Sequence, residues 1–251
     1  QRLLLPLPSD LAFEATTLAG CSTTAEFLAA LPSGAIVDRL SRRHPAMAVS
    51  REPPVLLVEA AIDAAYLEEL LSRSRAVGAL EHEAIGPLAA QEADIHHLQT
   101  ALRGRFLHGL ASDDLDPLRV PGTRIDPIAW RRLLQAGDVT AAVRRLPAGI
   151  LQPESGGRSR LSGPADRASA IARVEHQAWR RFALLAQRAF TSGNGGIATV
   201  VGYLGLRRVE SADLATLGEG LRLGLPAARI QAHLRSVGLR RSSDPGGGAH
   251  A

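Results

Sequence analysis

The segment from Gln91 to Leu115 repeats apolar residues at the spacing of an α-helix, and this pattern constrains the fold more than any other in the chain. Steps of three, four and seven positions place these residues on one face, so the pattern predicts an amphipathic helix with a single buried stripe. Gly109 can end the helix, and Ser112, followed by two aspartates, is typical of the N-cap of a short next helix. The stripe consists of Leu88, Ile95, Leu98, Leu102 and Phe106.

The other faces of this helix carry polar and charged side chains. Glu92 and His96 are four residues apart, and Asp94 and His97 are three apart, so either pair could share a metal ion. A two-metal site in a helical bundle needs a second such pair on another helix, and the sequence offers none. We therefore interpret the polar residues as an ordinary solvated helix face and expect no metal site, no cofactor and no catalytic constellation. These residues are Glu92, Asp94, His96, His97, Gln99, Arg103 and Arg105.

Composition favours packed helices over a sheet. The chain has 251 residues, of which 45% are hydrophobic but only 4% aromatic, so its core must be built from Leu, Ala, Val and Ile. Sheets are enriched in aromatic and β-branched residues, and no segment of the chain has the pattern of a strand. We therefore predict an all-α fold.

Capping residues, glycines and prolines indicate where the other helices begin and end. Thr23 and Glu26 have the spacing of a capping box, and Asp126, followed by proline, is a strong start signal. Pro87 is expected near the first turn of the helix described above, and Gly78 is expected to end the helix before it. The predicted helices span about 9–20, 23–31, 55–77, 87–109, 127–135, 138–146, 167–190 and 197–221, with a short one from 226, a loop at 41–54 and a linker at 152–168.

A weaker copy of the opening helix segment occurs about 116 residues later, as part of a longer internal repeat. Three blocks agree in the same order, and a unit of this length is better described as a helical lobe than as a solenoid repeat. We predict pseudo-repeated multi-helix lobes at about 1–115 and 116–235, forming a domain of residues 1–235, with a disordered tail at 236–251. The matched blocks are LPSG at 31–34 with LPAG at 146–149, Val58-Glu59 with Val174-Glu175, and Asp94, Leu98 and Thr100 with Glu210, Leu214 and Thr216.

Charge and cysteine content narrow the possible partners. All 29 basic residues are Arg, and the net charge of +4 is too mild, and the arginines too scattered, for a nucleic-acid footprint. The single cysteine, Cys21, excludes an internal disulfide and fits a reducing compartment. No run approaches the ~18 apolar residues of a membrane span. The chain begins at Gln1 inside an apolar segment, so we expect an upstream part to be missing.

Several segments share the order and spacing of a known family: AIDAAYLEELL (61–71), AAQEADIHHLQTALRGR (89–105), PLRVPGTRIDPIAWRRLLQAGDVTAAVRRL (117–146) and YLGLRRVESADLATLGEGLRLGLPAARI (203–230). Together they resemble the C-type subunit of V/A-type rotary ATPases, whose counterpart in eukaryotic V-ATPases is the d-type (AC39) subunit. The resemblance covers almost all of residues 1–235. At some motif positions the chain departs from the family: the motif Asn is His97 in one copy and Asp213 in the other, a Lys-Glu pair is Arg207-Arg208, a turn Lys is Leu221, and the second Gly of a Pro-Gly-Gly loop is Thr123.

The resemblance implies a non-catalytic protein built from three pseudo-repeated helical lobes, of which this chain would hold all or most of the second and third and a remnant of the first. Such proteins are sockets on the cytoplasmic side of the membrane ring of proteolipid subunits. They accept the end of the central shaft and pass rotation between ATP hydrolysis and proton or sodium translocation. The implied partners are the shaft subunits and the proteolipid ring, with membrane contact only through the complex and no nucleic acid.

Charged residues of the two helix copies are the candidate contacts with the shaft or between the lobes. Two other hypotheses stay open on the sequence: an Arg-rich helical module that binds nucleic acid, and a helical metalloenzyme that uses His96 and His97. The candidate contact residues are Glu92, Asp94, Arg103, Arg105, Arg207, Arg208, Glu210 and Arg222.

Overall fold

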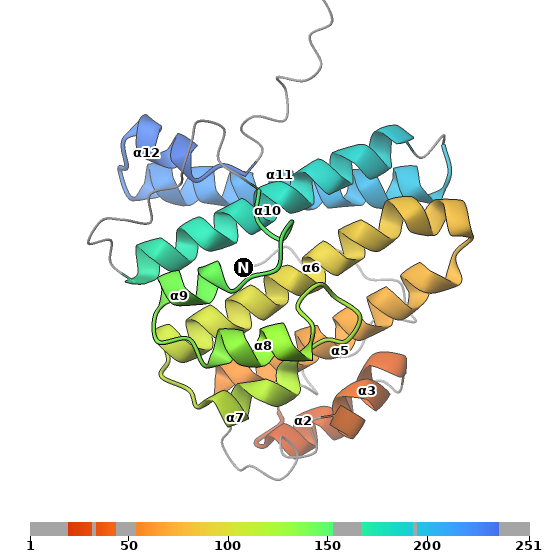
Figure 1. Cartoon of the computed structure of the whole chain (residues 1–251), viewed down its shortest axis with the longest axis vertical. Helices are drawn as coiled ribbons and strands as arrows, with labels where there is room; N and C mark the ends of the chain where they lie inside the picture. Colours follow the sequence, from red (N-terminus) through yellow and green to blue (C-terminus); the bar gives the residue numbers. More distant parts are fainter. Residues whose placement is uncertain (1–19, 32–33, 44–53, 153–166, 193–194, 236–251) are drawn as a thin grey trace, which may run out of the picture.

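The computed structural model of the chain describes residues 20–31, 34–43, 54–152, 167–192 and 195–235 (Figure 1). Over these ranges it contains ten α-helices, one 3-10 helix and no strand. The predicted all-α fold is therefore confirmed. No helix in the described ranges is both long and apolar enough to cross a bilayer. The predicted helix at 9–20 and the predicted tail at 236–251 lie outside these ranges, as does most of the predicted loop and linker.

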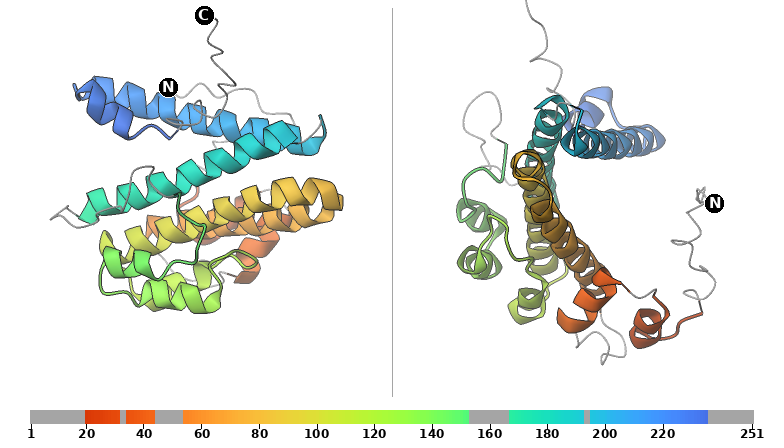
Figure 2. Two further views of the ribbon diagram at one scale, coloured as in Figure 1. Left: turned by 45° about the horizontal axis from the view of Figure 1, so that its top comes forward. Right: turned by 90° about the vertical axis from the view of Figure 1, so that its right-hand side faces the viewer.

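Four long helices form two hairpins that pack side by side (Figures 1 and 2). In the packing order α5, α6, α10, α11, each helix lies against the next, so α6 is enclosed between its own hairpin partner and α10. Helix α6 also contacts α11, and these two helices run in the same direction. The long helices are α5 (Val55–Ala76), α6 (Ala79–Phe106), α10 (Arg167–Ser192) and α11 (Ile197–Arg222).

Short helices flank both hairpins in the same order along the chain. Short helices precede each hairpin, and further short helical segments follow it. In Figure 2, α8 and α9 lie on the opposite side of α6 and α10 from α5 and α11. The short elements are α2 (Thr24–Ala30), α3 (Ala35–Arg43), α7 (Ser112–Leu115), the 3-10 helix η1 (Asp116–Leu118), α8 (Pro127–Leu134), α9 (Val139–Arg144) and α12 (Ala227–Ala232).

Side-chain caps start three of the short helices where the sequence predicted. The Thr23 hydroxyl accepts a hydrogen bond from the Glu26 backbone N–H at 3.1 Å. The carboxylates of Asp126 and Asp138 accept from the N–H groups three residues ahead, each at 2.7 Å. Such bonds satisfy amide groups that have no partner inside the helix, which is why these residue types begin helices.

One hydrophobic core runs through both hairpins and the short helices α8 and α9. The apolar stripe predicted for α6 is confirmed, since four of its five residues are buried and Phe106 packs half-buried at its end. Trp130 from α8 and Phe182 from α10 are the largest buried side chains in the described ranges. Because one core serves both hairpins, neither hairpin buries its apolar face without the other.

Helix α3 was not predicted, and its last three residues, 41–43, fall in the predicted loop at 41–54. Two helix boundaries also differ from the prediction. Helix α6 begins at Ala79, with Gly78 as its N-cap, so Pro87 lies inside the helix and not near its first turn. An interior proline removes one backbone hydrogen bond at a cost of about 3 kcal/mol, and burial of Ile85 before it and of the long apolar stripe after it offsets this loss. Ser112 is the first residue of α7 and not its N-cap, because its hydroxyl donates to the Leu134 carbonyl at 3.2 Å.

Candidate partner-binding surfaces

Polar side chains of α6 hold the segment that connects the two hairpins. The Gln91 amide donates to the carbonyl oxygen of Ile150 in this segment (2.9 Å) and to that of Ala178 in α10 (3.1 Å). The Asp94 carboxylate accepts from the Ile125 N–H at 3.2 Å. Buried backbone groups outside regular helices need such partners, because no helix ladder satisfies them. These α6 residues therefore have a structural role.

His97 completes this set of buried contacts. Its Nε2 accepts a hydrogen bond from the Val120 N–H at 2.8 Å, and its ring lies 5.1 Å from the ring of Trp130. Burial lowers the pKa of His97, while the carboxylate of Asp94, 4.0 Å from Nδ1, opposes that shift. The neutral imidazole is the form that fits, since a charged ring could not accept the Val120 N–H.

The interpretation of the polar α6 residues as a solvated face is wrong for Asp94, His96 and His97. Gln91, Asp94 and His97 are completely buried, and His96 is nearly so. The helical period of the sequence could not reveal this burial, because α6 is covered on more than one side. The polar side chains of α6 form the hydrogen bonds that the backbone packed against them needs. The described residues contain no group of three or more His, Cys, Asp or Glu side chains that could hold a metal ion.

The two predicted arginines on α6 make contacts within the chain. Arg103 forms a two-pronged ion pair with Glu175 on α10, with both N–O distances at 2.6 Å, and this raises the pKa of Arg103. Arg105 donates to the carbonyls of Leu134 (3.0 Å) and Leu110 (2.7 Å). Both side chains therefore fasten α6 to its neighbours, with part of each still exposed to solvent.

Glu92 and Arg208 join the two hairpins. They form an ion pair between α6 and α11, and the Arg208 guanidinium also lies over the Trp179 ring, 5.3 Å from its centre. A small cavity of about 110 Å³ opens beside them, with Asp63 and Tyr66 of α5 in its wall. Burial raises the pKa of Asp63, and the charge of Arg208 opposes that shift.

The remaining predicted residues lie on the exposed part of α11. Arg207 pairs with Glu210, and Arg222 pairs with Glu219, in both cases three residues apart on the helix surface. All four side chains are at least half exposed, so their charges remain accessible to another protein. Pairs of this kind add little to helix stability.

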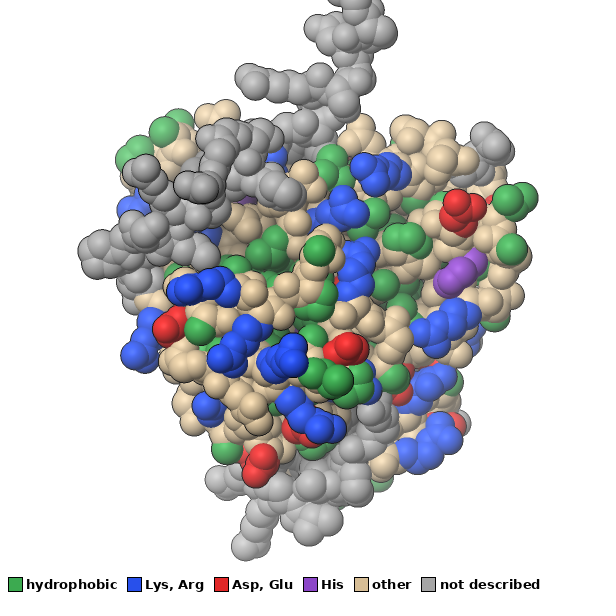
Figure 3. All heavy atoms as spheres, viewed as in Figure 1, with side chains coloured by type: hydrophobic (Ala, Val, Ile, Leu, Met, Phe, Trp, Pro, Cys, Tyr) green, Lys and Arg blue, Asp and Glu red, His purple; other side chains and the backbone are tan. Residues whose placement is uncertain are grey.

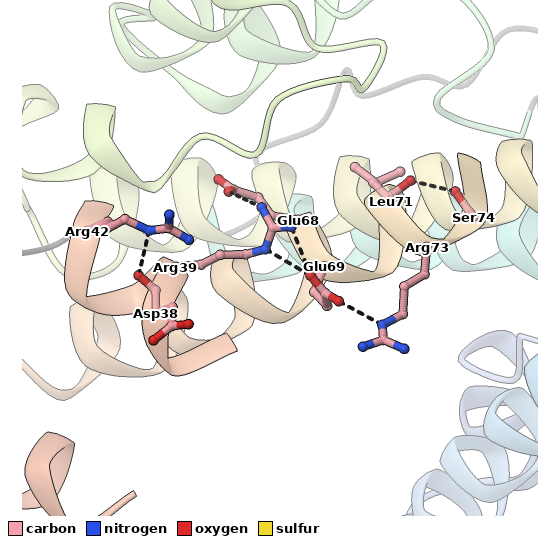
Figure 4. A network of polar contacts seen from close by, with 8 residues as sticks. All are labelled: Asp38, Arg39, Arg42, Glu68, Glu69, Leu71, Arg73 and Ser74. Atoms are coloured by element: carbon pink, nitrogen blue, oxygen red, sulfur yellow. Dashed lines mark hydrogen bonds and ion pairs between the residues drawn. The ribbon is translucent and has the colours of Figure 1, made fainter. Parts of the chain in front are cut away.

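Sequence analysis missed an ion-pair network that joins α3 to α5 (Figure 4). Arg39 donates to the Glu69 carboxylate through Nε (3.0 Å) and Nη2 (2.8 Å), and its Nη1 lies 3.8 Å from Glu68. Arg73 contacts the same Glu69 at 2.7 Å, and the two arginines lower the pKa of Glu69. In the sequence, the only local indication of this network was the pair of adjacent glutamates, Glu68 and Glu69, on a mostly apolar helix.

Arginines gather over α8, α9 and α10 on the face seen in Figure 3. Arg181 on α10 is partly buried, and its pKa is lowered by that burial and by the neighbouring charges of Arg124 and Arg188. We call these three residues the arginine cluster. None of them forms an ion pair with a carboxylate in the described part of the chain, so the cluster carries uncompensated positive charge.

A family model described as "ATP synthase (C/AC39) subunit" matches residues 1–233. The chain belongs to this family. No curated protein and no solved structure matches it. Members of the family are non-catalytic accessory subunits of V/A-type ATPases, so this C/AC39 protein is not itself an enzyme. Its partners are other subunits of a rotary ATPase, and ion transport is the activity of the whole complex.

Proposed function

We propose that this C/AC39 protein is the central-stalk subunit that couples the rotating shaft of a proton- or sodium-translocating ATPase to the membrane proteolipid ring. The observation that carries the proposal is the family match over residues 1–233. In this role the protein lies on the cytoplasmic side of the membrane and touches the bilayer only through the complex.

Torque transmission needs a body that does not bend under load. The contacts that join the two hairpins suit this requirement: a shared core, the Arg103–Glu175 pair and the Glu92–Arg208 pair. Packed interiors transmit strain because they have few voids and little freedom to rearrange.

The order of the helices supports the division into two lobes, at about residues 1–115 and 116–235. Each half contains short helices, a long hairpin and a short helical segment after it. Glu92 and Arg208 are 116 positions apart, the offset of the sequence repeat. Near the start of the same helices, Glu81 accepts from the Ala198 N–H at 2.8 Å, 117 positions away. Equivalent helices therefore pack in register, as expected of two related lobes.

Two surfaces have charge available for the partners. The arginine cluster suits a partner with acidic residues, and Arg207, Glu210 and Arg222 on α11 supply a mixed surface. Of the predicted contact residues, Glu92, Asp94, Arg103, Arg105 and Arg208 are assigned to contacts between or within the lobes.

Reconstitution tests the proposal. The purified chain is mixed with the shaft subunits and, separately, with the detergent-solubilised proteolipid ring of its own ATPase, and complexes are isolated by size exclusion. We expect binding to both. Binding to neither would overturn the proposal, and binding to the ring alone would remove the coupling role.

A further inference from the structure

A cavity of about 650 Å³ lies where the turns of the two long hairpins come together. It is lined by the first turns of α6, the last turns of α10 and the start of α11. Its volume falls in the range of sites that bind small molecules, and most of its wall is apolar, as in such sites. The apolar wall consists of Leu80, Ala84, Pro87, Leu185, Ala189 and Ala198.

Arg188 connects this cavity to the arginine cluster. It lines the cavity and is also a neighbour of Arg181, whose Nε is buried and has no hydrogen-bond partner among the described residues. Leu185 and Ala189 follow Arg181 at steps of four along α10, and both line the cavity. Residues four apart lie on the same face of a helix. One row of α10 side chains therefore runs from the cluster into the cavity.

Arg124 is held in place at the other side of the cluster. Its Nη1 donates to Gln91 Oε1 (3.1 Å) and to the Gly149 carbonyl (2.5 Å). Gln91 in turn donates to the carbonyl of Ala178, three residues before Arg181. Guanidinium groups that are fixed and close together present several N–H donors to one anion, and their mutual repulsion is offset when that anion binds. Three of them supply more donors and charge than one carboxylate can use, so a phosphate group fits best.

The charges around the cavity divide between its two ends. Glu81 accepts from the Ala198 N–H at 2.8 Å, at the start of α11, and therefore lies at the end away from Arg181. Neither Glu81 nor the exposed Glu83 forms an ion pair with Arg188 in the described part of the chain. In Figure 3, hydrophobic side chains lie between the arginines over α10 and the acidic side chains at the start of α6. An anionic group is therefore attracted to the arginine end and repelled from the other.

We propose that the arginine cluster and the cavity together bind an anionic amphiphile, a molecule with a phosphate head group and an apolar chain. The head group pairs with the three arginines, and the chain lies along Leu185 and Ala189 in the cavity. An acidic protein surface would use the arginines but leave the apolar cavity unfilled, so the two features together favour an amphiphile. The ligand enters as a single molecule, without contact between the protein and a bilayer. This inference goes beyond the proposed coupling role and does not depend on it.

Calorimetric titration of the full chain with butyl, hexyl and octyl phosphate, each below its micelle concentration, tests the proposal. We expect each added methylene to tighten binding up to about fourfold, because it is buried in an apolar site. Inorganic phosphate should bind far more weakly than octyl phosphate. Octylammonium has the same chain with the opposite charge and should not bind measurably.

Two kinds of variant separate the head-group site from the chain site. Arg181→Gln and Arg188→Gln should each weaken octyl phosphate binding at least about tenfold, since each removes a charge-assisted contact. Arg229→Gln is the matched control, because Arg229 is exposed on α12, outside the cluster and the cavity. Ala84→Phe fills part of the cavity and should reduce the preference for octyl over butyl phosphate. Circular dichroism checks that each variant is folded.

Three results would overturn the proposal. Equal affinities for inorganic phosphate and octyl phosphate would mean that the cavity contributes nothing. Octyl phosphate binding that neither arginine variant weakens would mean that the cluster does not hold the head group. A chain that binds phosphatidylglycerol vesicles but not octyl phosphate would have a membrane-binding surface in place of the proposed site.

Discussion

Arg208 on α11 forms an ion pair with Glu92 on α6, 116 positions earlier in the chain, and lies over Trp179 on α10. One arginine side chain therefore contacts two long helices besides its own. The pair joins equivalent positions of the two proposed lobes, and it does so at the edge of a small polar cavity. Removing this contact by mutation therefore tests how much it contributes to the packing of the two hairpins.

Arg208→Ala should lower the free energy of unfolding by about 1 kcal/mol, because it removes the ion pair and the contact with the Trp179 ring while the half-exposed site screens the charge. Urea denaturation measures this change. Arg222→Ala, which removes an exposed pair within α11, should have no measurable effect. Equal losses in both variants would mean that the Arg208 contacts do not join the hairpins.

Gly202 allows α11 to pack closely on α10. A Cβ at this position would meet backbone atoms, including the Ala186 carbonyl oxygen at 2.8 Å, which cannot move aside as a side chain can. We expect Gly202→Ala to lower the free energy of unfolding by at least about 2 kcal/mol, the usual cost of overpacking.

Gly218 on the same helix is the matched control, because nothing lies within 4 Å of a Cβ built there. Gly218→Ala should raise the free energy of unfolding by about 0.5–1 kcal/mol through the better helix propensity of Ala. A Gly202→Ala variant as stable as the wild type would show that the helices are less closely packed than described.

His97 should make the protein sensitive to mild acid. Burial lowers the pKa of His97 in the folded state, whereas the unfolded side chain titrates at its ordinary value of 6.5. Below pH 6.5 the unfolded chain binds a proton that the folded chain does not, so the free energy of unfolding falls until the folded pKa is reached. Above pH 6.5 this contribution is constant.

The slope from one such group approaches about 1.4 kcal/mol per pH unit. Urea denaturation at several pH values between pH 8 and mildly acid pH measures this slope. His97→Gln should flatten the profile, because a glutamine carbonyl can still accept from Val120 and does not titrate in this range. His176, whose pKa is also lowered by burial, remains in that variant, so part of the slope should persist. An unchanged slope in His97→Gln would contradict the prediction.

The arginine cluster should contribute to the rate at which the protein binds its partners. Arg188 is the exposed member, and Arg188→Glu reverses its charge beside Arg181. We expect association with an acidic partner to slow several-fold, with a weaker dependence on salt, because surface charge acts mainly on the encounter step. Stopped-flow or biolayer measurements at several salt concentrations report this. Arg229→Glu on α12 is the control, and an equal effect there would assign the change to net charge alone.

The sequence by itself determined most of the helices and three of their caps, but it did not predict α3 (Ala35–Arg43). Thr23, Asp126 and Asp138 cap helices through bonds to residues only three positions away, and the apolar stripe of α6 follows from a period within a single element. The repeat that we predict from the sequence has an offset of 116, and the contact between Glu92 and Arg208 has the same separation. Caps and periodicity depend on residues close together in the chain, and a repeat is found by comparing the chain with itself. None of these patterns requires knowing which helix packs against which.

Only the tertiary structure decided which polar and apolar side chains are covered. Asp94 and His97 were expected in solvent and are buried, because the connecting segment places the N–H groups of Ile125 and Val120 against them. The same spacing of apolar residues is covered on α6 and open on α11. The period of apolar residues describes a single helix. Whether its side chains are buried depends on a second element that packs against it and comes from a distant part of the chain or from another molecule.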